Sequence, residues 1–276
     1  MFTLLPEFEG REARVYVSNG VAIRRLKCAA DRTRMKAAHA LLALDHPNLV
    51  RILQIALDGD MHMQCMQISL QRHMAPGHAC AGHVKLSVAR HVTSGLRHLH
   101  THSMQHEDLC PNNVLLAWRH GVMEVRLCDF YSERSGIHRT PAYAAPEVVR
   151  GPAEDVTCAA DVWAFACCIL FMEGAEPFRG FEDSMAVFFY IAKHYAVGFK
   201  EDGVLKQFSL QHCEYGPARH IGLTMWAPVL SHIFVPEHAR LSSQQLHERL
   251  GMLEAPPASS MQKAPSPRQP LKRFNF

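Results

Sequence analysis

The sequence lacks a long apolar segment, a strong excess of one charge and a secretory signal. Its longest apolar run, Val162 to Met172, is too short for a membrane span, which needs about 20 residues, and so predicts a buried helix. The 29 basic and 26 acidic side chains nearly balance, so neither nucleic acid nor a membrane is expected as a partner. Residues 1–10 carry two glutamates and no basic cluster, which argues against a secretory signal.

Paired cysteines are also missing. None of the nine cysteines forms a C-x-x-C pair, and Cys167 and Cys168 lie inside the apolar run. An odd number without paired spacing argues against a disulfide framework and favours a reducing compartment. The tightest metal-like cluster, His78, Cys80 and His83, has no second ligand pair at zinc-finger spacing, so a structural zinc site is not expected.

The first quarter of the chain has strand patterns. The predicted strands cover residues 14–17, 21–26, 49–57 and 61–68. Asn19-Gly20 joins the first two strands and is a strong hairpin signal, because both residues tolerate positive φ. Asp58-Gly59-Asp60 joins the last two. Between the pairs, residues 32–44 are rich in helix-forming residues, and His46-Pro47 ends the predicted helix.

The rest of the chain has mainly helical patterns, with one more strand pair, 113–117 against 124–127. The predicted helices cover residues 83–102, 161–173, 185–196, 226–234 and 242–250. This order predicts an α+β fold with a small β-rich lobe, residues 1–68, and a larger helical lobe, residues 69–253. Residues 254–276, rich in proline, serine and basic side chains, are predicted to be disordered, with a docking role as the alternative.

Three short segments carry residues suited to chemistry. In His106-Glu107-Asp108-Leu109-Cys110-Pro111-Asn112-Asn113, an aspartate is followed five residues later by an asparagine. Asp129-Phe130-Tyr131 follows a predicted strand, and Thr140-Pro141-Ala142-Tyr143-Ala144-Ala145-Pro146-Glu147 comes next. In this order and spacing, the segments resemble the catalytic loop, the DFG motif and the APE motif of eukaryotic protein kinases.

The resemblance covers roughly residues 8–250 and implies a bilobal kinase-like fold that uses ATP and Mg²⁺. Asp108, Asn113 and Asp129 are the implied catalytic set, with Asp108 accepting the proton of a substrate hydroxyl. Asn113 and Asp129 are the implied metal ligands.

The same resemblance assigns structural roles farther along the chain. Asp161 is expected to begin a buried helix that braces the catalytic loop. Arg240 is expected to pair with Glu147.

The N-terminal segment departs from the family pattern. Its glycine-rich phosphate loop should read G-x-G-x-x-G-x-V, but aligned on Val15 the glycine positions hold Phe8, Gly10 and Ala13. The bulky Phe8 and the missing third glycine limit how closely the backbone can cover phosphates.

Val21-Ala22-Ile23-Arg24 resembles the V-A-I-K strand of the family, with arginine in place of lysine. Strand alternation puts Ala22 and Arg24 on one face and Lys27 on the other. The helix glutamate that should pair with the lysine is replaced by Ala37, so the usual ion pair cannot form. The residues expected to bind the nucleotide are Gly10, Val15, Ala22, Arg24, Asn113 and Asp129.

The catalytic segments depart from the family at three positions. Glu107 replaces the arginine of H-R-D, which in many kinases receives a phosphate from the activation segment. A glutamate repels phosphate, so activation of that kind is not expected. Cys110 replaces a lysine common in Ser/Thr kinases, and Tyr131 replaces the DFG glycine, which stiffens the turn.

Two functions fit this sequence. The first is a slow ATP-dependent protein Ser/Thr kinase, favoured by the complete set of Asp108, Asn113 and Asp129. The second is a pseudokinase that acts as a binding or scaffolding module, favoured by Arg24 and Ala37. A small-molecule kinase is less favoured, because residues 140–147 resemble a peptide-substrate loop.

Both main hypotheses imply a protein partner, either a substrate or a regulated protein, inside the cell in cytoplasm or nucleus. The compact N-terminal lobe and the His, Met and Cys content also resemble kinase domains of some large DNA viruses. A viral protein in a host cell is therefore an open alternative.

Overall fold

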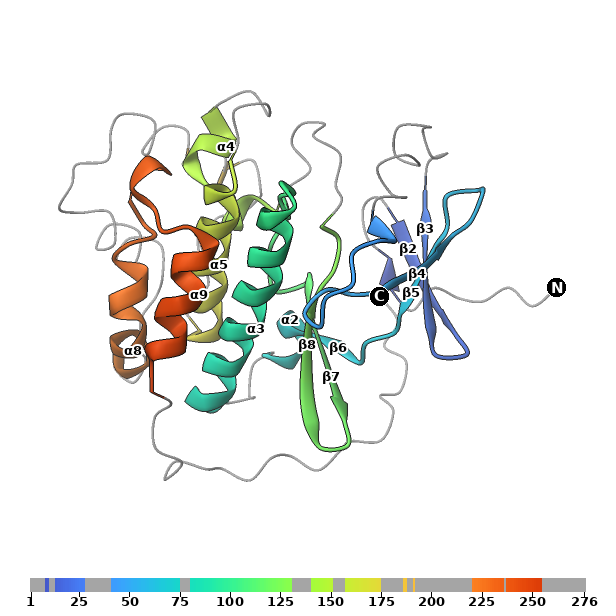
Figure 1. Cartoon of the computed structure of the whole chain (residues 1–276), viewed down its shortest axis with the longest axis horizontal. Coiled ribbons are helices and arrows are strands. Elements are labelled where there is room, and N and C mark those ends of the chain that lie inside the picture. Colours follow the sequence, from blue (N-terminus) through green and yellow to red (C-terminus); the bar gives the residue numbers. More distant parts are fainter. Residues whose placement is uncertain are drawn as a thin grey trace.

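The computed structural model describes residues 8–9, 13–27, 41–74, 80–130, 140–150, 157–174, 186–187, 191, 220–235 and 237–254. A five-stranded sheet lies on one side, a group of helices lies on the other, and a three-stranded sheet lies between them (Figure 1). The predicted bilobal α+β fold is confirmed. The division after residue 68 stays a prediction, and residues 255–276 of the tail lie outside the described residues.

The five-stranded antiparallel sheet has the order β1-β2-β3-β5-β4. Its strands are β1 (Phe8–Glu9), β2 (Ala13–Ser18), β3 (Val21–Leu26), β4 (Ile52–Ile55) and β5 (Met61–Gln64). At the β2–β3 turn, Asn19 has φ 49° and Gly20 has φ 76°, which confirms the predicted hairpin.

The second sheet has the order β6-β7-β8, with β6 (Ile68–Ser69), β7 (Val114–Arg119) and β8 (Val122–Leu127). The predicted pairing of 113–117 with 124–127 is confirmed by the β7–β8 register. The predicted extents 49–57 and 61–68 were wrong. Leu49 bridges to Leu127 and Ile68 pairs with Leu116, so the outer ends of both runs join the second sheet.

The described part of the helical lobe contains two long helices, several short ones and two 3₁₀ turns. Their bounds are α2 (Leu70–His73), α3 (Gly82–Thr101), η1 (Pro141–Tyr143), α4 (Pro146–Arg150), α5 (Ala159–Met172), α8 (His220–Leu230), η4 (Glu237–Ala239) and α9 (Ser243–Met252). The predictions for α3, α5 and α9 are confirmed to within two residues. None of the described helices is both long and apolar enough to span a bilayer.

The prediction of a helix over 226–234 was wrong at both ends. The observed α8 starts at His220 and stops at Leu230, with Pro228 inside it and a turn over residues 231–233. The start was missed because a glycine and a threonine weaken the helical pattern there. The predicted helix over 32–44 lies outside the described residues except for its last four positions. The predicted helix over 185–196 also lies outside them, except for three positions.

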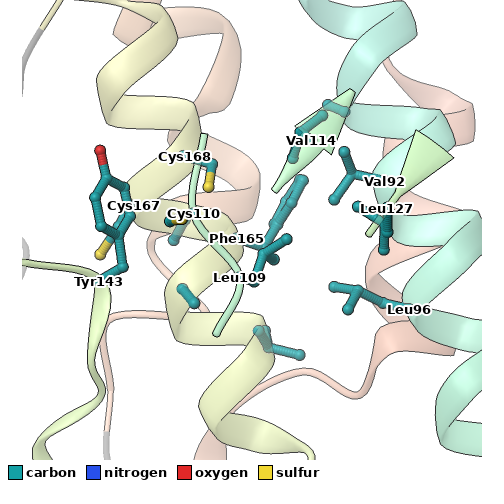
Figure 2. Packing of buried hydrophobic residues seen from close by; sticks show 14 of the residues in the cluster. Val92, Leu96, Leu109, Cys110, Val114, Leu127, Tyr143, Phe165, Cys167 and Cys168 are labelled. Carbon is teal, nitrogen blue, oxygen red and sulfur yellow. The ribbon is translucent and has the colours of Figure 1, made fainter. Parts of the chain in front are cut away.

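Helix α5 forms the centre of the helical lobe. It is apolar on every side, and nearly all of its residues are buried, as expected for a helix surrounded by protein. Figure 2 shows Leu109 and Cys110, from the predicted catalytic loop, lying against this helix beside Phe165 and Cys168. The loop therefore rests on the most buried of the described helices.

Candidate active site

The carboxylate of Asp108 is held by groups on both sides. The backbone N–H and the hydroxyl of Thr140 donate to its Oδ1 at 2.8 and 2.9 Å. The side-chain amide of Asn113 donates to the Asp108 carbonyl oxygen at 2.8 Å and to Oδ2 at 3.3 Å. The structure thus brings together the predicted base and the predicted asparagine, and it orients the carboxylate.

Burial raises the pKa of Asp108 from 3.8 to about 6, and the nearby Asp129 charge adds to the rise. Hydrogen bonds from Thr140 and Asn113 act in the opposite direction. A carboxyl group with a pKa near 6 is ionised at neutral pH and is more basic than an exposed aspartate. These properties suit a general base.

Asp161, near the start of α5, holds the predicted catalytic loop in place. Its carboxylate accepts hydrogen bonds from the backbone N–H groups of His106 and Glu107 at 2.7 and 3.0 Å, and its Oδ2 lies 2.9 Å from His100 Nε2. Burial alone would raise the pKa of Asp161. The hydrogen bond with His100 and the charge of His100 outweigh burial, so the pKa is lowered overall. The predicted bracing role of Asp161 is confirmed.

Asp129 lies just beyond β8 and has a left-handed backbone with φ 58°. Non-glycine residues in this region are uncommon and cluster at functional sites. Cys128, one residue earlier, donates its backbone N–H to the Asn113 carbonyl at 3.0 Å, so the backbone that leads into Asp129 lies beside Asn113.

The residue types at this position fit Mg²⁺. Because the nitrogen of the Asn113 side chain donates to Asp108, its amide oxygen is the atom suited to a metal, and Asp129 adds carboxylate oxygens. Among the described residues, no group of three or more His, Cys, Asp or Glu side chains could hold a metal ion. A cation here would therefore depend on Asn113, Asp129 and the phosphate oxygens of a nucleotide, as Mg²⁺ commonly does.

Arg24 reaches Asp129 from the five-stranded sheet. Its Nε lies 3.2 Å from Asp129 Oδ1, and its side chain is only 11% exposed. In the β2–β3 register, Val15 lies opposite Arg24 and Val17 opposite Ala22, so the predicted nucleotide-binding residues Val15, Ala22 and Arg24 share one face. Phe8 lies opposite Val15, whereas Gly10 lies outside the described residues.

Cys110 stands beside Asp108, the predicted base, at the position where many Ser/Thr kinases have a lysine. It is buried, and burial together with the Asp108 charge raises the pKa of its thiol to about 12. The nearby Thr140 side chain lowers that pKa in part. The thiol is therefore neutral and adds no charge beside Asp108.

The segment after Thr140 is anchored to the helical lobe. The guanidinium of Arg240 pairs with both carboxylate oxygens of Glu147, with Nη2 2.9 Å from Oε2. The predicted Arg240–Glu147 pair is confirmed, and it fixes the loop that begins with η1.

Two contacts of the site were not predicted. The sequence placed Thr140 in a substrate loop that resembles the Ser/Thr class, and the threonine-proline pair did not predict its hydrogen bonds to Asp108. The sequence left open whether Arg24 reaches Asp129. The sequence signal for this contact was indirect, namely the absence of a helix glutamate at position 37.

Comparison with known proteins gives the family. Residues 12–211 match the model described as the protein kinase domain. The chain belongs to the protein kinase family. The eukaryotic-type resemblance found in the sequence is thereby confirmed. The catalytic roles of Asp108, Asn113 and Asp129 stay predictions.

Three curated relatives illustrate the similarity. A probable serine/threonine-protein kinase, mkcC of Dictyostelium discoideum, is 29% identical over 162 residues, which cover 56% of this chain and 18% of that protein. Serine/threonine-protein kinase ATG1c of Arabidopsis thaliana is 29% identical over 178 residues, covering 58% and 23%. MAP kinase kinase kinase wis4 of Schizosaccharomyces pombe is 26% identical over 170 residues, covering 54% and 12%. The matched part is thus less than a quarter of each relative.

Proposed function

We propose that this chain is an ATP-dependent protein Ser/Thr kinase with a slow catalytic step. The observation that supports it most is the hydrogen-bonded set of Asp108, Thr140 and Asn113. A pseudokinase that has lost catalysis has no need to orient a buried carboxylate with three donor groups. Such orientation is what proton abstraction from a substrate hydroxyl requires.

In the proposed reaction, Asp108 accepts the proton of a Ser or Thr hydroxyl while Thr140 and Asn113 fix the direction of its carboxylate. Mg²⁺, when bound with ATP, would neutralise charge on the phosphates. Asn113 and Asp129 would hold that cation, and Arg24 would supply a fixed positive charge close to it. With a pKa of about 6, Asp108 is in its basic form at neutral pH.

The proposed substrate class is a protein. The loop after Thr140 is fixed by Arg240 and Glu147 beside the base, where an extended peptide would have to lie. Two of the relatives described above carry the name serine/threonine-protein kinase. The identity of the protein substrate is left open.

The proposed slowness follows from three substitutions. Arg24 replaces the family lysine, Ala37 replaces the helix glutamate, and Phe8 replaces a glycine of the phosphate loop. Loss of one well-placed electrostatic group typically lowers the rate by about 10²- to 10³-fold. The expected result is a weak enzyme rather than none.

The second candidate is a pseudokinase that binds a protein partner. The observation that favours it is the ion pair between Arg24 and Asp129, which occupies a carboxylate that the chemistry needs. In this alternative, the cleft would bind nucleotide without phosphoryl transfer.

Transfer of radiolabelled phosphate from ATP to casein and to the chain itself tests the proposal. We expect slow labelling on Ser and Thr, reduced about 10²- to 10⁴-fold in Asp108→Asn because the base is lost. Asp45→Asn, at an exposed aspartate, is the matched control and should keep the wild-type rate. Labelling that Asp108→Asn leaves unchanged would overturn the base assignment. Nucleotide binding with no labelling would establish the pseudokinase alternative.

A further inference from the structure

A line of hydrogen bonds runs from α9 to the predicted catalytic loop. Ser243 is the first residue of α9, which lies beside α3 (Figure 1), and its Oγ lies 2.8 Å from His100 Nδ1. The Nε2 atom of the same ring lies 2.9 Å from Asp161 Oδ2. Asp161 in turn accepts the backbone N–H groups of His106 and Glu107, which directly precede the predicted base. Helices α9, α3 and α5 are thereby connected to the loop through their side chains.

The charge of Asp161 determines which atom donates in each of these bonds. Burial raises the pKa of Asp161, but the hydrogen bond with His100 and the charge of His100 outweigh burial, so its carboxylate is ionised at neutral pH. Because an ionised carboxylate only accepts hydrogen bonds, Nε2 of His100 carries a proton. In the neutral ring Nδ1 is then the acceptor, and the Ser243 hydroxyl is the donor. The hydroxyl therefore favours the tautomer that Asp161 requires.

All three side chains of this line are shielded from water. Ser243 is 5% exposed, and the side chains of His100 and Asp161 are 9% and 3% exposed. Water cannot readily replace a hydrogen bond at such a position, so removing the hydroxyl would leave His100 Nδ1 without its donor. The ring would then lose one of the two hydrogen bonds that orient it. Ser243 thus limits how far the ring, and with it the Asp161 carboxylate, can turn.

The hydroxyl of Ser243 is not required to start α9 or to dock it. Ser242 is the N-cap, and it forms a capping box with Gln245. At the other end of α9, Arg90 of α3 donates to backbone carbonyl oxygens at 3.0 and 2.7 Å. Alanine at position 243 would therefore remove the contact with His100 and preserve both ends of the helix.

We propose that Ser243 is a positioning residue for the predicted catalytic loop. Its hydroxyl orients the His100 ring, the ring holds the Asp161 carboxylate, and the carboxylate holds the backbone beside Asp108. Ser243 acts through these side chains and has no part in the chemical step. Its effect on the reaction rate rests on the proposed kinase function, whereas its effect on the loop does not.

Hydrogen exchange followed by mass spectrometry tests the effect on the loop. Exchange is measured relative to that of α5, which reports opening of the whole lobe. In Ser243→Ala, the amides of His106 and Glu107 should exchange about tenfold faster than in the wild type, the usual effect of weakening one hydrogen bond to a charged group. Ser242→Ala, the same change one residue earlier, is the matched control. It removes the cap of α9, so it should lower the melting temperature and leave the relative exchange of the loop unchanged.

Two further variants test whether Ser243 acts through His100. Ser243→Thr keeps a hydroxyl and should retain slow exchange at both loop amides. In a His100→Phe chain, which lacks both ring nitrogens, adding Ser243→Ala should change nothing further, because effects within one hydrogen-bond network are not additive. Melting curves establish that each variant is folded, and the threonine variant decides alone if His100→Phe does not fold. Fast loop exchange in folded Ser243→Thr, or an undiminished effect of Ser243→Ala in His100→Phe, would overturn the inference.

The phosphate-transfer assay measures the effect on rate. Ser243→Ala should lower kcat by about 10- to 100-fold and leave the KM for ATP unchanged, because a displaced base affects the chemical step rather than nucleotide binding. Ser242→Ala should keep the wild-type kcat.

The outcomes separate the inference from the proposed function. Faster loop exchange with an unchanged kcat would overturn the positioning role. Unchanged loop exchange in folded Ser243→Ala would overturn the inference and leave the proposed kinase function intact. If the wild-type chain transfers no phosphate, the proposed function fails, and the relative exchange of the loop still decides whether Ser243 positions it.

Discussion

Arg240 and Glu147 lie 93 residues apart in the sequence and form a two-pronged ion pair inside the helical lobe. The Arg240 side chain is fully buried, with its guanidinium carbon 4.9 Å from the centre of the Trp163 ring. It also donates to the carbonyl oxygens of Val235 and Ala159. This one side chain therefore ties the proposed substrate loop to α5 and to the turn before α9.

Replacing Arg240 with methionine should destabilise the fold by about 3–5 kcal/mol, because Glu147 would be left partly buried without a partner. Urea unfolding at pH 7 measures the change in the free energy of unfolding. The double variant Arg240→Met with Glu147→Gln should lose less, because it leaves no unpaired charge. A single variant that lost under about 1 kcal/mol would show that Glu147 is hydrated and that the pair contributes little.

The Arg240–Glu147 pair was predictable because each residue belongs to a motif whose partner is known for the family. The Arg24–Asp129 pair was not, because neither motif specifies it. It depends on the missing helix glutamate and on how the two sheets face each other. Sequence periodicity describes one strand at a time, and side-chain partners across a cleft depend on packing that it does not encode.

The fold was predicted well where patterns were long and local. Helices α3 and α5 follow from apolar spacing, and the β2–β3 hairpin follows from Asn19-Gly20. The strand ends were wrong because apolar alternation is the same whichever sheet a strand joins. Leu49 and Ile68 continue their apolar runs but pair with the second sheet. Hydrogen-bond partners of distant segments decided these positions.

The raised pKa of Asp108 predicts the pH dependence of the proposed kinase reaction. A general base must be deprotonated, and the pKa of Asp108 is about 6. The value of kcat/KM should therefore be constant above about pH 7 and fall tenfold per unit below pH 6. Thr140→Val removes one donor that lowers this pKa, so the fall should begin at higher pH. Rates measured from pH 5 to 8 give both profiles. Identical profiles would show that the Thr140 hydroxyl does not tune the base.

The raised pKa of Asp108 also affects the stability of the fold. Its effect on the pH dependence of stability is opposite in sign to that of an aspartate whose pKa is lowered by folding. The pKa of about 6 in the folded chain lies above the ordinary aspartate value of 3.8, so the folded chain binds more protons between these values. Protonated Asp108 therefore favours the fold at low pH, and this contribution is lost as the pH rises from about 4 to 6. Its size is about 3 kcal/mol, since one pKa unit corresponds to about 1.4 kcal/mol. Urea unfolding of Asp108→Asn should lack this component of the pH dependence.

Three neighbouring histidine rings predict acid sensitivity elsewhere in the molecule. The His46 and His98 ring centres lie 4.6 Å apart, and those of His98 and His102 lie 4.5 Å apart. Burial lowers the pKa of His46 from 6.5 to about 4, helped by the charges of His98, Arg97 and Arg126. In the unfolded chain His46 binds its proton near pH 6.5, so the free energy of unfolding should fall as the pH drops from 6.5 to 4.

His46→Gln removes the group responsible and should flatten this part of the stability profile, measured by thermal unfolding at pH 4.5, 5.5 and 6.5. His98→Phe keeps a ring between His46 and His102 and removes one repelling charge, so it should flatten the profile in part. A profile that neither variant alters would place the acid sensitivity elsewhere in the chain.

Gly95, in the middle of α3, marks a close approach that permits no side chain. A Cβ built there would lie 2.9 Å from the Asn48 carbonyl oxygen and 3.0 Å from Leu127 Cδ1. That carbonyl accepts the backbone N–H of Leu127 at 2.8 Å, so it cannot move without breaking the link to β8. Gly95→Ala should therefore destabilise the fold by about 1–3 kcal/mol, although alanine normally favours a helix.

Gly251→Ala in α9 is the matched control. Its Cβ would meet nothing within 4 Å, and we expect a neutral change or a gain of up to about 1 kcal/mol. Urea unfolding of both variants decides the matter, because equal stabilities would show that α3 has room to shift away from the strand that leads to Asp129.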